Sequence, residues 1–306
     1  MRKSLESVNI VYHLAAETGT GQSMYEIERY TDVNVKGTSI LLEEIEQAGS
    51  VERIILSSSR SVYGEGEYLE KGGKISTPET RKVRDILEGR FEFFGEQYVK
   101  PVATRETARI STSSVYASTK YMQEMMIRNF AESRKIEYLI LRFQNVYGPG
   151  QSLKNPYTGI ISIFSNLAAA NKNISVFEDG HESRDFIFIE DVVSALSQGI
   201  HNKSEYRVIN VGTGESISVL KVAESIKTKL NSNSKISITG QFRAGDIRHC
   251  YANIERLATL IDTNNMVKFN DGISRFLEWF ISENLTEINF EDSIKLMEKK
   301  GLFFQN

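Results

Sequence analysis

The sequence predicts an α/β fold, with a parallel sheet and helices on both of its faces. Helical stretches with one apolar face, at 30–46 and 116–133, lie between short apolar runs. Those runs have the length and composition of buried strands, and the alternation of strand and helix indicates parallel pairing. Small or polar residues follow three of the strands, at the edge where parallel sheets bind ligands. The expected strands are 9–14, 53–58, 137–143 and 207–211.

The elements follow in order along the chain. The first strand is the run NIVYHL, and the helix after it can place Val33, Leu41, Leu42 and Ile45 on one face. The second strand is RIILSS, and the third, EYLILRF, follows the helix at 116–133. The fourth strand is RVINV.

Two segments depart from this alternation. Residues 64–112 are rich in Gly, Glu, Lys and Arg without steady periodicity, so we expect a long inserted loop after the second strand, of the kind that is functional or mobile. After Gly148 come helical patterns at 158–171 and 218–230 and a helical tail with Trp279. We therefore expect a first domain at 1–147, continued by 187–212. A smaller α+β lobe is expected from 148–186 and 213–306.

Composition excludes several classes of function. Apolar residues make up 40% and charged residues 25%, as in ordinary globular proteins, and the net charge of -3 gives no basic surface for nucleic acid. The longest apolar runs are too short to cross a bilayer. The single cysteine, Cys250, excludes an intrachain disulfide and fits a cytoplasmic location. No metal site is expected, because the four histidines lack ligand spacing.

Tyr116 and Lys120 form the first candidate for chemistry. Residues four apart share one face of a helix, so the two side chains can point the same way. A phenol is too weak a base at neutral pH, but a nearby ammonium group favours the phenolate and lowers its pKa. Such a pair can take a proton from an alcohol while hydride leaves the same carbon. A chance match is the alternative, because the chain has 13 tyrosines.

The serines of IILSSSRSVYGEG are the second candidate. Ser57, Ser58 and Ser59 follow a buried strand directly, so their hydroxyl groups lie where a ligand would bind. A serine-rich turn without function is the alternative. The strand ends HLAAET and LRFQNVYGPG add small and polar residues at the same edge.

Together these motifs resemble the extended short-chain dehydrogenase/reductases of the nucleotide-sugar epimerase/dehydratase family. The resemblance covers nearly the whole chain, in family order and spacing. It rests on HLAA at 13–16, NVKGT at 34–38, SSSRSVYG at 57–64, YASTK at 116–120, LRFQNVYGPG at 141–150, SRDFIFIEDVV at 183–193, NVGTGES at 210–216 and FRAGDIRH at 242–249. It implies a Rossmann-type cofactor domain, NAD as cofactor, a nucleotide-sugar substrate and a homodimer.

The resemblance also implies roles for single residues. Ser59 would hydrogen-bond the reacting hydroxyl, Tyr116 would be the base, and Lys120 would bind the nicotinamide ribose and lower the Tyr116 pKa. The residues expected to line the cofactor are Ala15, Ala16, Asn34, Ser57, Tyr116, Lys120 and Gln144. The residues expected to hold the nucleotide sugar are Asn145, Arg184, Arg243 and Asp246. Two arginines suit a diphosphate.

Alternatives remain for the substrate group. Arg184 can instead pair with Asp185 or Glu182 on a solvated surface, and Arg243 can form a simple loop ion pair with Asp246.

The reaction expected within this family is epimerisation at C4. Members that remove water carry an acidic pair directly after the catalytic hydroxyl residue, and decarboxylating members carry a glutamate there. This chain has Arg60 and Ser61 instead, so no base is in place for the C5 proton. The stretches at 13–30, 148–159 and 242–254 resemble dTDP-L-rhamnose 4-epimerase-like proteins, which implies a deoxysugar nucleotide and a role in cell-surface polysaccharide synthesis, such as O-antigen. The base and the sugar rest on resemblance alone.

The family's glycine-rich GxxGxxG turn lies upstream of HLAA, and this sequence has no equivalent. GTGQS at Gly19 follows the wrong strand, GEGEY at Gly64 opens no helix, and NVGTGES belongs to the substrate half. We therefore expect an N-terminally truncated Rossmann sheet with an open edge at 9–14 and weakened NAD binding. A mis-called start, a truncated gene, and a non-catalytic sugar-nucleotide-binding or dimerising protein are the alternatives.

Overall fold

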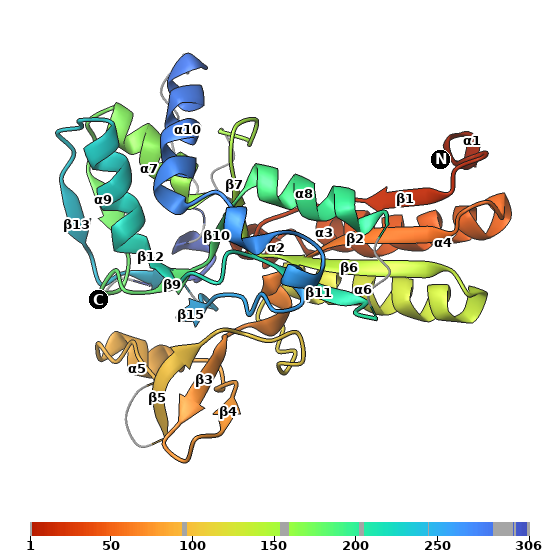
Figure 1. The fold of residues 1–306 in the computed structure, drawn as a ribbon. Coiled ribbons are helices and arrows are strands. Elements are labelled where there is room, and N and C mark those ends of the chain that lie inside the picture. The colour runs from red at the N-terminus through yellow and green to blue at the C-terminus, as the bar shows by residue number, and fades with distance from the viewer. Residues whose placement is uncertain are drawn as a thin grey trace.

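Four parallel strands form the central sheet of the chain, as the sequence predicted (Figure 1). The computed structural model describes residues 2–93, 97–153, 159–201, 205–243, 245–283, 296 and 298–304. The strand order is β1-β2-β6-β11, and all three pairings are parallel. The strands are β1 (Ile10–His13), β2 (Arg53–Ser59), β6 (Glu137–Phe143) and β11 (Val208–Val211).

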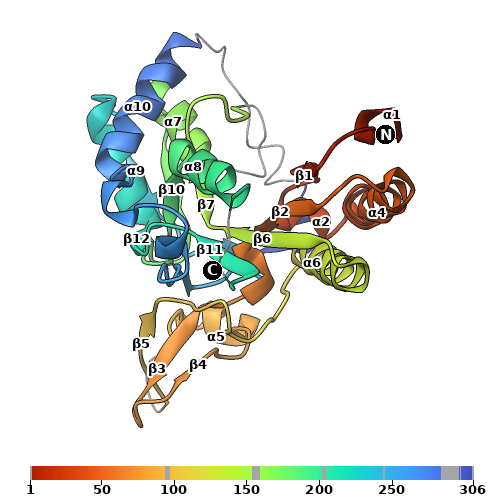
Figure 2. The same cartoon turned by 45° about the vertical axis from the view of Figure 1, so that its right-hand side comes forward.

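Helices cover both faces of this sheet. Ile54 and Leu56 of β2 pack on one face against α4 (Gly37–Ala48) and α6 (Val115–Arg134). Ile55, one residue out of phase, packs on the other face against α8 (Ile189–Gly199). Figure 2 shows α4 and α6 on one side of the sheet and α8 on the other. The alternation of apolar side chains along β2 thus fixes both layers.

The helix expected at 30–46 is interrupted. It begins as α3 (Ile27–Tyr30), passes through a π-helical segment (Thr31–Lys36), and continues as α4. The wider turn buries Asn34 completely, and its side chain holds the backbone of Glu17 and the hydroxyl of Thr119. The apolar periodicity of the sequence does not indicate a π-helical turn, because the residue that this turn buries, Asn34, makes polar contacts.

The edge of the sheet at β1 carries exposed apolar side chains. Among the described residues β1 pairs only with β2, and Tyr12 and Leu14 are 37% and 51% exposed. In the described part of the chain, the edge expected at 9–14 is therefore open, and it exposes apolar side chains.

The described parts of residues 64–112, which are 64–93 and 97–112, contain strands and a helix, which corrects the expectation of an irregular loop. An antiparallel sheet of order β4-β3-β5 stands below the main sheet with a short helix beside it (Figure 1). Its elements are β3 (Glu67–Glu70), β4 (Ile75–Ser76), α5 (Val83–Leu87) and β5 (Tyr98–Val102). The strands are too short and too charged to show period-two alternation in the sequence.

The second lobe packs around an apolar core of its own. Phe164, Phe186, Ile226 and Phe276 are buried in this core, and Trp279 packs at its margin. Its helices are α7 (Ile160–Ala169), α9 (Val219–Lys229) and α10 (Phe269–Ser282). Its strands are β7 (Asn145–Tyr147), β8 (Ile174–Val176), β9 (Ser183–Arg184), β10 (Phe186–Phe188), β12 (Ile217–Ser218), β13 (Ile236–Ile238), β14 (Phe242–Arg243), β15 (His249–Cys250) and β16 (Phe303–Phe304).

Short elements complete the description. They are α1 (Arg2–Leu5), α2 (Thr20–Ser23) and the 3₁₀ segments Arg60–Tyr63, Leu257–Thr259 and Thr263–Asn265.

A buried cluster of charged residues connects the insertion, residues 64–112, to the second lobe. Arg248 is fully buried, and its guanidinium donates to Glu178 and Asp179 of the lobe and to Glu92 of the insertion. Arg81 of the insertion makes two hydrogen bonds to Glu178, at 2.7 and 2.8 Å. The insertion is thereby held against the lobe by ion pairs removed from solvent.

Replacing Arg248 with Met should destabilise the protein strongly. Without the Arg248 guanidinium, several buried carboxylates lose their cation, which lowers the free energy of unfolding by about 3–5 kcal/mol. Urea unfolding measures this, with Arg84→Met as control, because the Arg84 side chain is 86% exposed. A loss below about 1 kcal/mol would contradict this account of the cluster.

Candidate functional site

One cavity of about 1070 Å³ lies at the carboxyl ends of β2 and β6. The main sheet contributes Ser57, Ser58 and Ser59 at the end of β2, and Gln144 and Asn145 after β6. The second lobe supplies the facing wall through α7, β8 and the segments around β9 and β14. A cleft between two lobes at this end of a parallel sheet is where open α/β folds bind their ligands.

The cavity brings together the three residues expected to be catalytic. Ser59, Tyr116 and Lys120 all line it. The helix α6 begins at Ser114, whose side chain accepts a hydrogen bond from the Ala117 amide, so Tyr116 stands in the first turn. The Tyr116 amide in turn donates to the Ser23 hydroxyl at 2.9 Å.

The charges that act on Tyr116 and Lys120 differ from those expected from the sequence. Burial raises the pKa of Tyr116, and a hydrogen bond with the Ser59 side chain and the charge of Arg60 act in the opposite direction. Burial also lowers the pKa of Lys120 to about 8, against the attraction of Glu124. Arg60 is therefore the cation whose charge favours the Tyr116 phenolate here. Lowering of the Tyr116 pKa by Lys120 stays a prediction.

Two residues expected at the cofactor lie outside the cavity wall. Ala15 is exposed, and Asn34 is buried behind the loop that it holds at Glu17. Ala16 of the same loop does line the cavity. Asn34 thus fixes the loop that carries Ala16 and, through Thr119, the first turns of α6.

Gln144 has the arrangement expected of a residue that faces a ligand. Its side chain is buried in the cavity wall, and neither amide atom has a hydrogen-bond partner in the described part of the chain. An unpartnered buried amide is costly, so a bound group that satisfies it is favoured. The donor and acceptor of this amide suit the polar groups of a dinucleotide.

The expected substrate group lines the same cavity. Arg184 donates to the backbone oxygens of Ser183, Ile247 and Arg248 and makes no ion pair with a described residue. Asp185 is instead held by Thr213, Gly214 and Ala252, so the alternative pairing with Arg184 is not formed.

Arg243 and Asp246 make an ion pair at 2.9 Å on the cavity wall. The Arg243 guanidinium also lies 5.6 Å from the centre of the Phe177 ring. The loop ion pair considered from the sequence is therefore present, and it lies inside the candidate site.

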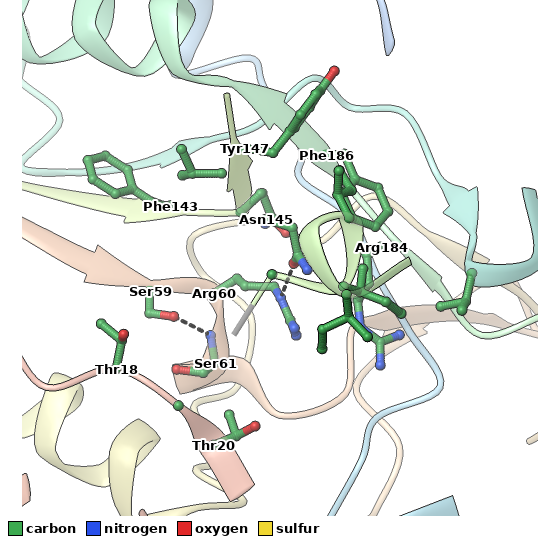
Figure 3. Close-up of a pocket in the computed structure, with 18 of the residues that line it drawn as sticks. Thr18, Thr20, Ser59, Arg60, Ser61, Phe143, Asn145, Tyr147, Arg184 and Phe186 are labelled. Atoms are coloured by element: carbon green, nitrogen blue, oxygen red, sulfur yellow. Dashed lines mark hydrogen bonds between the residues drawn. The ribbon is translucent and has the colours of Figure 1, made fainter. Parts of the chain in front are cut away.

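The structure adds wall residues that sequence reasoning did not assign. Arg60 lies beside Asn145 (Figure 3), and Phe177 and Glu182 border the far end of the cavity. Burial raises the pKa of the Glu182 carboxyl to about 7, helped by Glu178. The only signal for Arg60 was its position directly after Ser59.

The three glycine-rich stretches take different positions. Gly19 lines the cavity ahead of α2, a helix of four residues. A Cβ on Gly66 of GEGEY would lie 2.7 Å from the His249 oxygen, and one on Gly212 of NVGTGES 2.4 Å from the Asp185 carboxylate. Gly66 and Gly212 therefore serve close packing rather than phosphate binding.

Neither a metal centre nor a membrane-spanning helix is found in the described part of the chain. Among those residues, no group of three or more His, Cys, Asp or Glu side chains is placed to hold a metal ion. Within the same ranges, no helix has the length and apolar character needed to cross a membrane.

Comparison with known proteins identifies the relatives of this chain. It is 38% identical over 276 residues to dTDP-L-rhamnose 4-epimerase of Burkholderia thailandensis, covering 90% of this chain and 75% of the relative. The solved UDP-N-acetylglucosamine 4-epimerase of Methanobrevibacter ruminantium, in complex with UDP-N-acetylmuramic acid, matches with a TM-score of 0.73 at 28% identity. That match covers 92% of this chain and 79% of that one.

A second solved structure, MoeE5 in complex with UDP-glucuronic acid and NAD, also matches with a TM-score of 0.73. It is 25% identical, and the match covers 92% of this chain and 82% of that one. The family model described as "NAD dependent epimerase/dehydratase family" matches residues 1–84 and 92–212. The protein therefore belongs to the NAD-dependent epimerase/dehydratase family, whose fold and strand-end motifs it shares.

Proposed function

We propose that the protein is an NAD-dependent nucleotide-sugar 4-epimerase. The observation that carries the proposal is one cavity in which Ser59, Tyr116 and Lys120 lie on the sheet side and Arg184 and Arg243 on the lobe side. Hydroxyl, phenol and ammonium groups suit a sugar alcohol, and two guanidinium groups suit a diphosphate. A nucleotide sugar carries both a sugar alcohol and a diphosphate, a fixed number of bonds apart.

Each residue has a separate task in this proposal. Bound NAD supplies the acceptor and donor of hydride at C4. Ser59 hydrogen-bonds the C4 oxygen, and Tyr116 takes the hydroxyl proton and later returns it. Lys120 holds the nicotinamide ribose, while Ala16, Ser57 and Gln144 line the cofactor. The two lobes exclude water around the reacting carbon.

Epimerisation is favoured over elimination by the two residues directly after Ser59. Arg60 and Ser61 occupy the positions where dehydratases of the family carry acids. A guanidinium does not take up a proton at neutral pH, so Arg60 is no base for the C5 hydrogen. The sugar then keeps its C5 hydrogen, and only the configuration at C4 changes.

A dTDP-6-deoxyhexose such as dTDP-L-rhamnose is the proposed substrate. It is supported by the 38% identity with the Burkholderia thailandensis enzyme of that name. The proposed setting is the cytoplasmic supply of precursors for cell-surface polysaccharide. A homodimer through α6 is part of the proposal, supported by Met122, which is 42% exposed on that helix. A non-catalytic sugar-nucleotide-binding protein is the rival, and the Tyr116 variant below separates the two.

Tyr116→Phe should abolish epimerisation while leaving binding intact. Loss of the proton-transferring hydroxyl is expected to lower kcat by about 10²–10⁴-fold, because general acid–base catalysis contributes that much. Conversion of dTDP-L-rhamnose to its C4 epimer is followed by proton NMR with NAD present, and dTDP binding is checked by calorimetry.

Tyr121→Phe is the matched control, since Tyr121 lies on the same helix and does not line the cavity. Epimerisation by Tyr116→Phe at the wild-type rate would contradict the assignment of the base. A wild-type chain that binds dTDP-L-rhamnose without converting it would favour the non-catalytic rival.

Lys120→Met should make the protein more stable at neutral pH. The pKa of Lys120 is lowered from 10.5 to about 8, so keeping the buried ammonium costs about 3 kcal/mol of folding free energy wherever both states are protonated. That cost is complete below pH 8 and fades between pH 8 and 10.5, as the folded chain loses its proton before the unfolded chain does.

Urea unfolding of both proteins from pH 7 to 10.5 measures this. The variant should be more stable by about 2–3 kcal/mol at pH 7, with a difference that shrinks as the pH rises. The exposed Lys221→Met serves as control. A Lys120→Met protein less stable than wild type at pH 7 would show that Lys120 contributes to folding instead.

A further inference from the structure

Arg60 lies at the reacting end of the cavity. It follows Ser59 directly, at the start of the 3₁₀ segment Arg60–Tyr63, and its half-buried side chain forms part of the cavity wall. Figure 3 shows the side chain extending from the end of the strand toward Asn145, with Arg184 close by. The charge of Arg60 favours the Tyr116 phenolate and opposes the charge of Arg184.

The guanidinium is fixed at one nitrogen and open at the other two. Its Nε donates to the Asn145 side-chain oxygen at 2.9 Å. Over the described ranges of the chain, neither terminal nitrogen has a hydrogen-bond partner, and no carboxylate pairs with the group. Arg81, Arg142 and Arg248 differ, because each binds carboxylates directly. Arg184 also lacks a carboxylate partner among the described residues, but its guanidinium is held by backbone oxygens at both terminal nitrogens.

An arginine held in this way recognises oxygen atoms. Its two terminal amino groups present donors in a fixed plane and carry no acceptor. The Asn145 contact already fixes the rotamer, so little conformational entropy is lost when a ligand binds. The acceptors that a nucleotide sugar offers beside Ser59 and Tyr116 are the sugar oxygens, since the diphosphate is expected at Arg184 and Arg243.

We propose that Arg60, held by Asn145, is a sugar-binding residue whose terminal amino groups donate hydrogen bonds to the sugar oxygens next to the reacting carbon. The inference rests on the proposed function and adds to it a determinant of sugar orientation. Arg60 stands where dehydratases carry a carboxylate that can remove the C5 proton, so it would hold the sugar at this position without offering a base.

The test compares two ligands that differ only in the sugar. Calorimetry measures the Kd of dTDP and of dTDP-L-rhamnose for the wild-type chain, Arg60→Met and Arg60→Lys, with NAD present. Arg60→Met should raise the Kd of dTDP-L-rhamnose by about tenfold or more and change the Kd of dTDP by less than about twofold. This is the result expected when charged hydrogen bonds to the sugar alone are lost. Arg60→Lys should recover part of the loss. Arg84→Met, at an exposed site, is the control.

The other outcomes overturn the inference in distinguishable ways. An equal loss for both ligands would place Arg60 at the diphosphate, and no loss for either would show that it does not touch the ligand. Retained dTDP affinity also shows that each variant is folded. A wild-type chain that binds neither ligand would contradict the proposed function itself, and this inference with it.

Discussion

The candidate site depends on one buried ion pair between helix α6 and the sheet. Glu124 of α6 accepts two hydrogen bonds from Arg142 of β6, at 3.0 and 2.7 Å, and also one from Ser58 of β2. Arg142 reaches on to the Tyr63 hydroxyl, which donates to Asn210 of β11. Glu124 lies one turn beyond Lys120, so this network fixes the face of α6 that carries Lys120 against the strand ends. Both charges are satisfied, which is the condition under which a buried pair can define a unique geometry.

The facing wall is fixed by a second group of charges. Arg81 donates to Glu178 and also to the backbone oxygen of Asp246, so the folded insertion reaches the loop that carries Arg243. The same insertion supplies Glu65, which accepts hydrogen bonds from the Arg248 amide. Burial raises the pKa of Glu65 to about 7, against the pull of Arg81. Among its described residues, the insertion does not line the cavity, so it contributes to the site by holding the facing wall in place.

Much of the sheet and most of the site followed from the sequence, for identifiable reasons. Each of the four strands is a short apolar run, although the edge strand β1 is only partly buried. Small or polar residues at the strand ends predicted where the cavity lies. The π turn around Asn34 could not be predicted, because it arises from polar contacts between distant segments. The folded insertion was missed because ion pairs such as Arg248–Glu92 leave no periodic pattern. From the sequence, Arg60 mattered only because no acidic residue stands at its position. Its two terminal amino groups could be considered for ligand binding only once the contact of its Nε with Asn145 was known.

The proposed reaction changes the configuration at C4 by removing and returning the same hydrogen. The most direct test uses dTDP-L-rhamnose labelled with deuterium at C4, incubated with the chain and NAD in ordinary water, with the product analysed by NMR and mass spectrometry. We expect the C4 epimer with the deuterium retained at that carbon. Loss of the label to water, a dehydrated product, or binding without conversion would contradict it.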